Sequence, residues 1–133
     1  MARFEEAALL LDRAHEDLLA LRNMLDMKAF SDSVFGFHAQ QAVEKAAKAW
    51  LIIRDIDVGR THDLRLLLLK LGGAGLIVSV DWQDLADLND FAVQYRYGAP
   101  PDDAPLSRLG LLGRGERFVH DAESAIHVDV SKP

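Results

Sequence analysis

Five side chains of types that hold phosphate groups are candidates for a binding site, and all five lie on or beside predicted helices. Arginine can donate two parallel hydrogen bonds to a phosphate, and tyrosine can stack on a base or donate its hydroxyl. Lysine and histidine add further donors. These candidate ligand-binding residues are Lys45, Lys48, His62, Arg96 and Tyr97. Three neighbours are expected to support them: Gln41, Glu44 and Asp63.

Several of these residues form a ladder along one predicted helix, residues 35–53. The apolar residues of that helix recur at steps of three and four, which places them on one side. They are Phe35, Ala39, Ala42, Val43, Ala46, Trp50 and Ile53. The ladder runs down the other side: Phe37, Gln41, Glu44, Lys45 and Lys48. Glu44 and Lys48 have the favourable acid-before-base spacing of i,i+4. The spacing alone is typical of a solvated helix face, whereas the particular order of residues favours a binding surface.

Arg96 and Tyr97 come at the predicted end of a later helix. An alternative role for Arg96 is an ion pair, with Glu44 or with an aspartate of the following loop, that locks the helices together. The two roles are compatible, because an arginine oriented by a carboxylate is also well placed to bind phosphate. We expect the Arg96–Tyr97 pair to meet the Gln41–Lys48 ladder around one small cationic pocket.

Other site chemistries have little support in the sequence. Di-metal sites in helical bundles need paired Glu-x-x-His motifs on facing helices, and this sequence has none. The glycines at 72, 73 and 75 lack the Lys and Ser or Thr of a P-loop, and no Gly-x-Ser-x-Gly motif occurs. We therefore expect no metal and no cofactor, with a nucleotide as the candidate ligand. His15 and His38 are interpreted as bystanders at helix surfaces.

Two long amphipathic helices are predicted in the first half of the chain, over residues 2–26 and 35–53. Three residues in the break between them favour an N-cap: Ser31, Asp32 and Ser33. Four or five helices with short connections predict an all-α, antiparallel up-and-down four-helix bundle with a short additional helix.

A short, leucine-rich helix is predicted next, with Thr61 as its N-cap and Asp63 in its first turn. It should end at Gly72 and Gly73. Its leucines occur on all sides, which predicts a helix buried between others; a buried strand is the alternative. A fourth helix starts at Asp81. A flexible loop at about 98–115 then precedes a last helix at about 116–128 and a frayed tail at 129–133.

The bulk properties indicate one domain spanning residues 1–133. A formal net charge of -6 disfavours broad electrostatic capture of nucleic acid and limits RNA binding to a local basic patch. No segment resembles a signal peptide or a membrane span, and cysteine is absent. We therefore expect a cytoplasmic protein with no membrane contact. The wide apolar helix faces of so small a domain predict a homodimer that completes the core.

The order of motifs resembles the HEPN domain, the higher-eukaryote and prokaryote nucleotide-binding helical domain, in its small, stand-alone prokaryotic type. Three short motifs carry the resemblance: Phe-x-x-Gln-Gln-Ala-x-Glu-Lys-x-x-Lys-Ala, then His-Asp-Leu, then Arg-Tyr at the end of the fourth helix. Here they begin at Phe37, His62 and Arg96, and the first motif includes Gln40, Gln41 and Glu44. The resemblance covers about residues 5–123.

The resemblance implies a helical bundle, often dimeric, that is frequently paired with a minimal nucleotidyltransferase encoded beside it. In many such pairs the HEPN member is a ribonuclease toxin and the nucleotidyltransferase is its antitoxin. Ribonuclease members carry an arginine near the end of the fourth helix, four to six further residues, and then a histidine. Across a dimer these residues form a composite cleft for charge stabilisation and acid–base transfer.

This sequence departs from the ribonuclease motif. The positions after Arg96 that should hold histidine are Pro101, Asp102 and Asp103, and two carboxylates there would repel an RNA backbone. Arg114 and His120 have the right spacing but come one helix too late, and we interpret them as coincidence. The first hypothesis is a nucleotide- or phosphate-binding module that works with a minimal nucleotidyltransferase. The alternatives are a metal-independent ribonuclease toxin and an inactive structural subunit.

Overall fold

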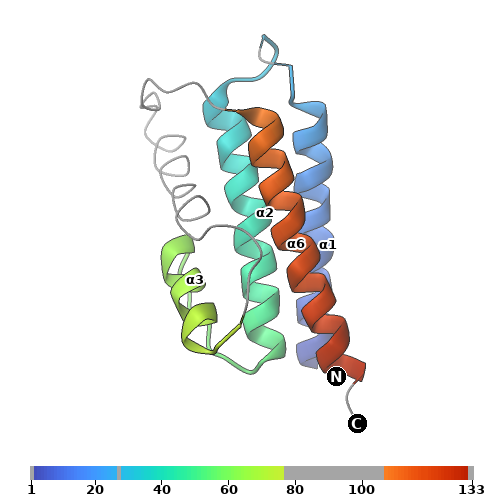
Figure 1. Cartoon of the computed structure of the whole chain (residues 1–133), viewed down its shortest axis with the longest axis vertical. Coiled ribbons are helices and arrows are strands. Elements are labelled where there is room, and N and C mark those ends of the chain that lie inside the picture. The colour runs from blue at the N-terminus through green and yellow to red at the C-terminus, as the bar shows by residue number, and fades with distance from the viewer. Residues whose placement is uncertain (1, 27, 77–106, 132–133) are drawn as a thin grey trace.

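The computed structural model describes residues 2–26, 28–76 and 107–131, and every regular element within them is a helix. The helices are α1 (Ala2–Asn23), α2 (Asp32–Ile53), α3 (Leu64–Gly73) and α6 (Arg108–Ser131). Figure 1 shows α1, α2 and α6 side by side along most of their length, with the short α3 beside one end of α2. The two termini lie at the same end of the bundle (Figure 1). The prediction of an all-α bundle is confirmed.

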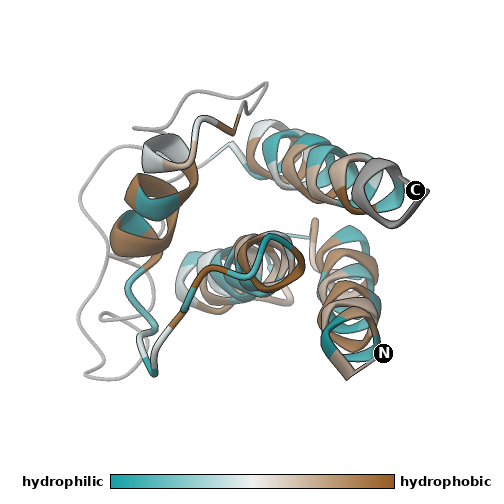
Figure 2. Cartoon of the chain, turned by 90° about the horizontal axis from the view of Figure 1, so that it is seen from below, coloured by the Kyte–Doolittle hydropathy of each residue, from teal (hydrophilic) through white to brown (hydrophobic). Residues whose placement is uncertain are grey.

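Helix α2 is the centre of the bundle, since it packs against α1, α3 and α6. Every residue of α2 is buried or partly buried. The predicted apolar side is buried as expected, except that Ile53 is only partly covered. On the α6 side, the Trp50 and Phe118 rings lie 6.0 Å apart between centroids. The end-on view in Figure 2 shows α2 lying between α3 on one side and α1 and α6 on the other.

The start of α2 follows the expected capping chemistry. Ser31 is the N-cap, and its side chain accepts a hydrogen bond of 3.2 Å from the backbone N–H of Val34. This bond satisfies one of the free N–H groups of the first turn. Asp32 then lies in the first turn of α2, where the helix dipole favours a carboxylate.

The start of α6 differs from the sequence prediction. Residues 108–115 were expected to belong to a flexible loop, but α6 begins at Arg108 and continues through Gly110, Gly113 and Gly115. Ser107 stabilises this start by accepting a hydrogen bond of 3.2 Å from the N–H of Gly110. Burial of leucines at 111 and 112 supplies the tertiary packing that outweighs the weak helix propensity of the glycines. The helix also extends beyond the predicted end at 128, to Ser131.

Helix α3 begins two residues later than predicted. Its N-cap is Asp63, whose carboxylate accepts from the N–H of Arg65 at 3.0 Å, and Thr61 instead accepts from the N–H of Asp63. The prediction of Thr61 as the helix cap is therefore wrong. A carboxylate and a hydroxyl are both good caps, so the sequence alone could not rank them.

The far end and the outer face of α3 also differ from prediction. The helix runs through both predicted stop glycines to a C-cap at Ala74, and Gly75 takes the left-handed conformation at φ +76°. Four leucines face inward, but Leu66 and Leu69 are exposed. The predicted burial on all sides is therefore wrong, as is the strand alternative.

The predicted fourth helix from Asp81, and the polar loop after it up to residue 106, lie outside the described residues. Among the helices that are described, none combines the length and the apolar character needed to cross a membrane.

Candidate functional site

The polar ladder of α2 is not a solvated helix face. Glu44 is only 3% exposed, and its neighbour Gln40 is fully buried. The segment before α3 lies against this side of the helix, where the backbone carbonyl of His62 lies 3.5 Å from the Gln40 amide nitrogen. Glu44 is thus a carboxylate in the interior of the protein.

Three donors surround Glu44: Gln40, Lys48 and His62. We call these four residues the Glu44 cluster. Gln40 donates from Nε2 to Glu44 Oε1 at 2.8 Å. On the other carboxylate oxygen, Lys48 donates from Nζ at 3.2 Å, and His62 Nδ1 lies at 3.0 Å. Burying a charged carboxylate is costly unless charged or hydrogen-bonding partners compensate it. These donors therefore both stabilise Glu44 and are held in place by it.

The geometry leaves His62 available for chemistry. Its side chain is 67% exposed, although its Nδ1 reaches the buried Glu44. When Nδ1 carries a proton and donates to Glu44, Nε2 on the far side of the ring accepts a proton in the neutral form and donates one in the cationic form. Lys48 uses one ammonium N–H on Glu44 and has two more. The cluster can therefore hold an anionic group or transfer a proton.

Lys45 does not join this cluster. Its Nζ donates to Asp17 of α1 at 2.6 Å, and His38 Nδ1 lies 3.5 Å from the other oxygen of the same carboxylate. We call Asp17, His38 and Lys45 the Asp17 cluster. Gln41 connects to the first cluster, since it donates from Nε2 to Gln40 Oε1 at 2.7 Å.

The structure thus brings together four of the predicted site residues: Gln41, Glu44, Lys48 and His62. Lys45 lies in the neighbouring cluster, and Asp63 caps α3. Arg96 and Tyr97 lie outside the described residues, so their meeting with the ladder stays a prediction. The same is true of an ion pair between Arg96 and Glu44.

Sequence reasoning missed Gln40, Asp17 and His38. Gln40 had a signal, because it lies four residues before Glu44 on one helix face. Asp17 had none, since its contact with Lys45 depends on how α1 packs against α2. His38 and His15 were interpreted as bystanders, yet each lies beside a carboxylate; His15 Nε2 is 2.9 Å from Glu123 on α6.

The Arg114 and His120 pair offers no second site within one subunit. The two residues lie six positions apart on α6, which places them about 120° apart around the helix axis. They therefore do not point toward the same ligand, which agrees with their interpretation as coincidence.

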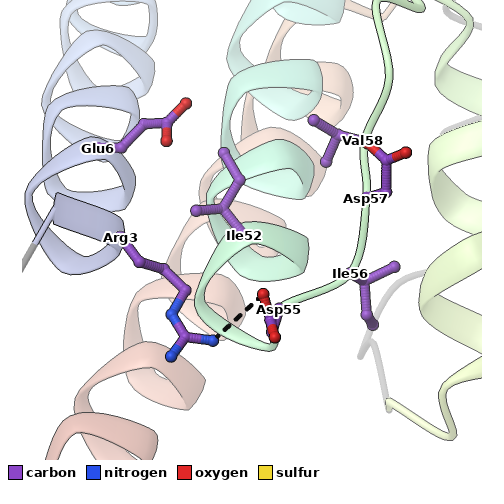
Figure 3. Close-up of a pocket in the computed structure, with 7 residues that line it drawn as sticks. All are labelled: Arg3, Glu6, Ile52, Asp55, Ile56, Asp57 and Val58. Atoms are coloured by element: carbon purple, nitrogen blue, oxygen red, sulfur yellow. Dashed lines mark ion pairs between the residues drawn. The ribbon is translucent and has the colours of Figure 1, made fainter.

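A separate pocket of about 430 Å³ lies where the start of α1 meets the segment after α2 (Figure 3). Its lining residues are Arg3, Glu6, Ile52, Asp55, Ile56, Asp57 and Val58. The lining contains three carboxylates and one guanidinium, and Arg3 already pairs with Asp55 at 3.6 Å. This excess of negative charge makes the pocket unsuitable for phosphate. Within the described ranges, no group of three His, Asp or Glu side chains is arranged to hold a metal ion.

The architecture defines an all-helical bundle whose central helix carries two lysines and one histidine beside carboxylates, with a second histidine in the segment before α3. The family model of the HEPN domain matches residues 7–130, and the chain belongs to the HEPN family. HEPN membership supports, in general terms, a nucleotide-binding or ribonuclease-type module. A comparison with curated proteins gave no match.

Proposed function

We propose that the chain is a HEPN-type module that binds a nucleotide or another phosphorylated ligand at the Glu44 cluster. Lys48 and His62 would hold the phosphate, and Arg96 with Tyr97 would complete the site. The observation that carries the proposal is the exposed imidazole of His62, oriented by a buried glutamate at 3.0 Å.

The His62 side chain is held in place before any ligand binds. A flexible surface histidine loses rotamer freedom when it binds a ligand, whereas His62 is already restrained by Glu44. An imidazolium in this position donates to Glu44 with Nδ1 and to a phosphate oxygen with Nε2. Such charge-assisted hydrogen bonds are stronger than neutral ones. The site therefore suits a small anion in spite of the acidic net charge of the chain.

Nucleotide titration tests the proposal. Because a ligand that binds the folded state stabilises it, ATP should raise the thermal midpoint and shift the imidazole NMR signals of His62. His62→Gln should weaken binding by about 1.5–3 kcal/mol, the usual contribution of a charged hydrogen bond. The matched control is His127→Gln, which changes an exposed histidine on α6 and should leave binding intact. If neither ATP nor other nucleotides change the midpoint or the His62 signals, the proposal fails.

A second variant tests the predicted contribution of the Arg96–Tyr97 pair. Arg96→Ala should weaken nucleotide binding by about 1–3 kcal/mol, the range for a lost charged hydrogen bond. Equal nucleotide affinity of Arg96→Ala and the unmodified chain would remove Arg96 from the site and leave His62 as its centre.

We further propose that the module acts in the cytoplasm as a homodimer beside a minimal nucleotidyltransferase, in a toxin–antitoxin-like pair. HEPN membership supports this partnership, and the absence of cysteine suits a reducing compartment. A small nucleotidyltransferase in the neighbouring reading frame, co-purifying with this chain, is the expected result. A neighbouring frame of another class, with no such complex, would contradict it.

The alternative is a metal-independent ribonuclease toxin, and the pairing of Glu44 with His62 favours it, because such a dyad can transfer protons without a metal. This alternative expects growth arrest on expression and RNA cleavage in the presence of EDTA. RNA cleavage that is unchanged in each of the variants His62→Gln, Arg96→Ala and His120→Ala would show that none of these residues belongs to a ribonuclease site. An inactive structural subunit would instead form a stable complex with its partner and bind no nucleotide.

A further inference from the structure

The two clusters on α2 share three residue types: a carboxylate, a lysine and a histidine. In the Asp17 cluster the carboxylate comes from α1, and Lys45 and His38 both contact it. In the Glu44 cluster the carboxylate comes from α2 itself. Among these three residue types, the carboxylate is the most buried in both clusters and the histidine is the most exposed; the His38 side chain is 33% exposed. The Asp17 cluster thus repeats the features that make the Glu44 cluster a candidate anion site.

The two clusters are adjacent. Lys45 and Lys48 lie three residues apart on one helix, which corresponds to about 4.5 Å along the axis and about 60° around it. Residues with this spacing are neighbours on a helix surface. Gln41 lies one turn before Lys45 and is hydrogen-bonded into the Glu44 cluster. The donors therefore form one short row along the partly exposed side of α2.

Within the part of the chain that the structure describes, donors of both clusters remain free for a ligand. Each lysine has three N–H groups, of which one is directed at its carboxylate. Both histidines contact the carboxylates through Nδ1, which leaves Nε2 on the far side of each ring. Each cluster can therefore donate to one anionic group.

We propose that the Asp17 cluster is a second anion subsite, so that the two clusters together bind the polyphosphate chain of a nucleoside diphosphate or triphosphate. This inference rests on the proposed function of the Glu44 cluster as the first phosphate site. A compact ligand fits better than an RNA strand, because an extended backbone needs a longer basic surface than two lysines of an acidic chain provide.

The test compares the affinities of AMP, ADP and ATP by calorimetry, without divalent cations. Affinity should rise with the number of phosphates, by about tenfold or more from AMP to ATP, as expected for an added charged hydrogen bond. Inorganic tripolyphosphate should compete with ATP, which separates recognition of the polyphosphate from recognition of the nucleoside.

Variants then separate the two subsites. His38→Gln should weaken ATP by about tenfold and AMP by less than about threefold, whereas His62→Gln should weaken both by about tenfold or more. Lys45→Gln removes the charge but retains a donor for Asp17, and it should reproduce the His38→Gln pattern. His127→Gln is the control. Thermal midpoints without ligand establish that each variant is folded.

Four results would overturn the inference. Equal affinities of AMP and ATP for the unmodified chain would show that the Asp17 cluster is not a second subsite, while the proposed function would still hold. The same conclusion would follow if His38→Gln and Lys45→Gln each weakened AMP binding and ATP binding equally. If an oligoribonucleotide binds more tightly than ATP, the ligand of the two clusters is an RNA and not the polyphosphate of a nucleotide. If no nucleotide binds at all, the proposed function itself fails, and the second subsite fails with it.

Discussion

Arg108 uses all the donors of its guanidinium, although it is only 6% exposed. Nη1 donates to the carbonyls of Met24 and Asp26 at 2.7 and 3.2 Å, and Nη2 donates to the carbonyl of Phe30 at 2.6 Å. Nη2 and Nε also reach Asp32 Oδ1, at 2.8 and 3.2 Å. One side chain at the start of α6 thus holds the connection between α1 and α2 and the first turn of α2.

Substitution of Arg108 should therefore be costly. Arg108→Leu removes the guanidinium donors to the Asp32 carboxylate and to the carbonyls of Met24 and Phe30, while the Asp26 carbonyl keeps the N–H of Phe30. It also removes a cation–π contact with Phe35 at 5.2 Å. Breaking a buried, hydrogen-bonded ion pair typically costs about 3–5 kcal/mol, and we expect a loss of this size in the free energy of unfolding. Urea denaturation measures it.

The matched control lies on the same helix. Arg117 is exposed, and Arg117→Leu should change the free energy of unfolding by no more than about 0.5 kcal/mol. Similar urea midpoints for the Arg108→Leu and Arg117→Leu variants would show that the buried guanidinium does not stabilise the bundle.

Among the elements, α2 shows how far sequence periodicity reaches. The repeat of apolar residues at steps of three and four predicted its buried side, because helix geometry alone decides which residues share a face. The same periodicity could not show that Glu44 on the other side is buried, since its burial depends on how other segments pack against α2. Contacts within one helix, such as Glu44 with Lys48, were predictable; those between segments, such as Lys45 with Asp17, were not.

The ends of the helices are a second feature that the sequence did not predict. Glycines predicted a stop at the end of α3 and a loop before residue 116, but α3 and α6 both contain glycines. Glycine lowers helix propensity by only about 1 kcal/mol, so burial of neighbouring leucines can outweigh it. A glycine ends a helix reliably only where the backbone needs a positive φ, and a sequence does not mark which of several glycines that is.

Gly75 and Gly73 provide a direct test of this distinction. Gly75 has φ +76°, and Gly75→Ala should destabilise the fold by about 1 kcal/mol because a Cβ is strained in this region. Gly73 is helical and has open space around its Cα, so Gly73→Ala should stabilise by about 0.5 kcal/mol. Chemical denaturation of the two variants measures both changes. If Gly75→Ala is as well tolerated as Gly73→Ala, the left-handed turn does not end α3.

At the scale of the whole molecule, ion pairs mark how the outer helices run past each other. His15 pairs with Glu123, and Arg22 pairs with Glu116. A later residue of α1 therefore pairs with an earlier residue of α6, so the two helices are antiparallel. Exposed pairs of this kind contribute little stability. They nevertheless favour one antiparallel alignment of the two helices, while the buried core supplies the free energy.

This core is substantial within one subunit, so a partner is not needed to bury the inward sides of α1, α2 and α6. A homodimer must instead cover leucines that are exposed. Leu66 and Leu69 of α3 lie at i,i+3 and form neighbouring apolar surface, and Leu69 is 63% exposed. Leu9 and Leu19 of α1 are separated by about 15 Å and about 80° around the helix, so they do not form one patch.

A two-fold interface uses the same patch from both subunits, which favours the outer face of α3 as the surface of the proposed homodimer. Light scattering at micromolar concentration should give twice the chain mass of 14.8 kDa. Leu69→Glu should shift the protein to a monomer, because two carboxylates would meet at the two-fold axis without partners. Leu19→Glu places the same charge on a similarly exposed leucine of α1 and should leave the dimer intact. A monomeric mass for the unmodified chain would rule out the homodimer, and dissociation by Leu19→Glu alone would move the interface to α1.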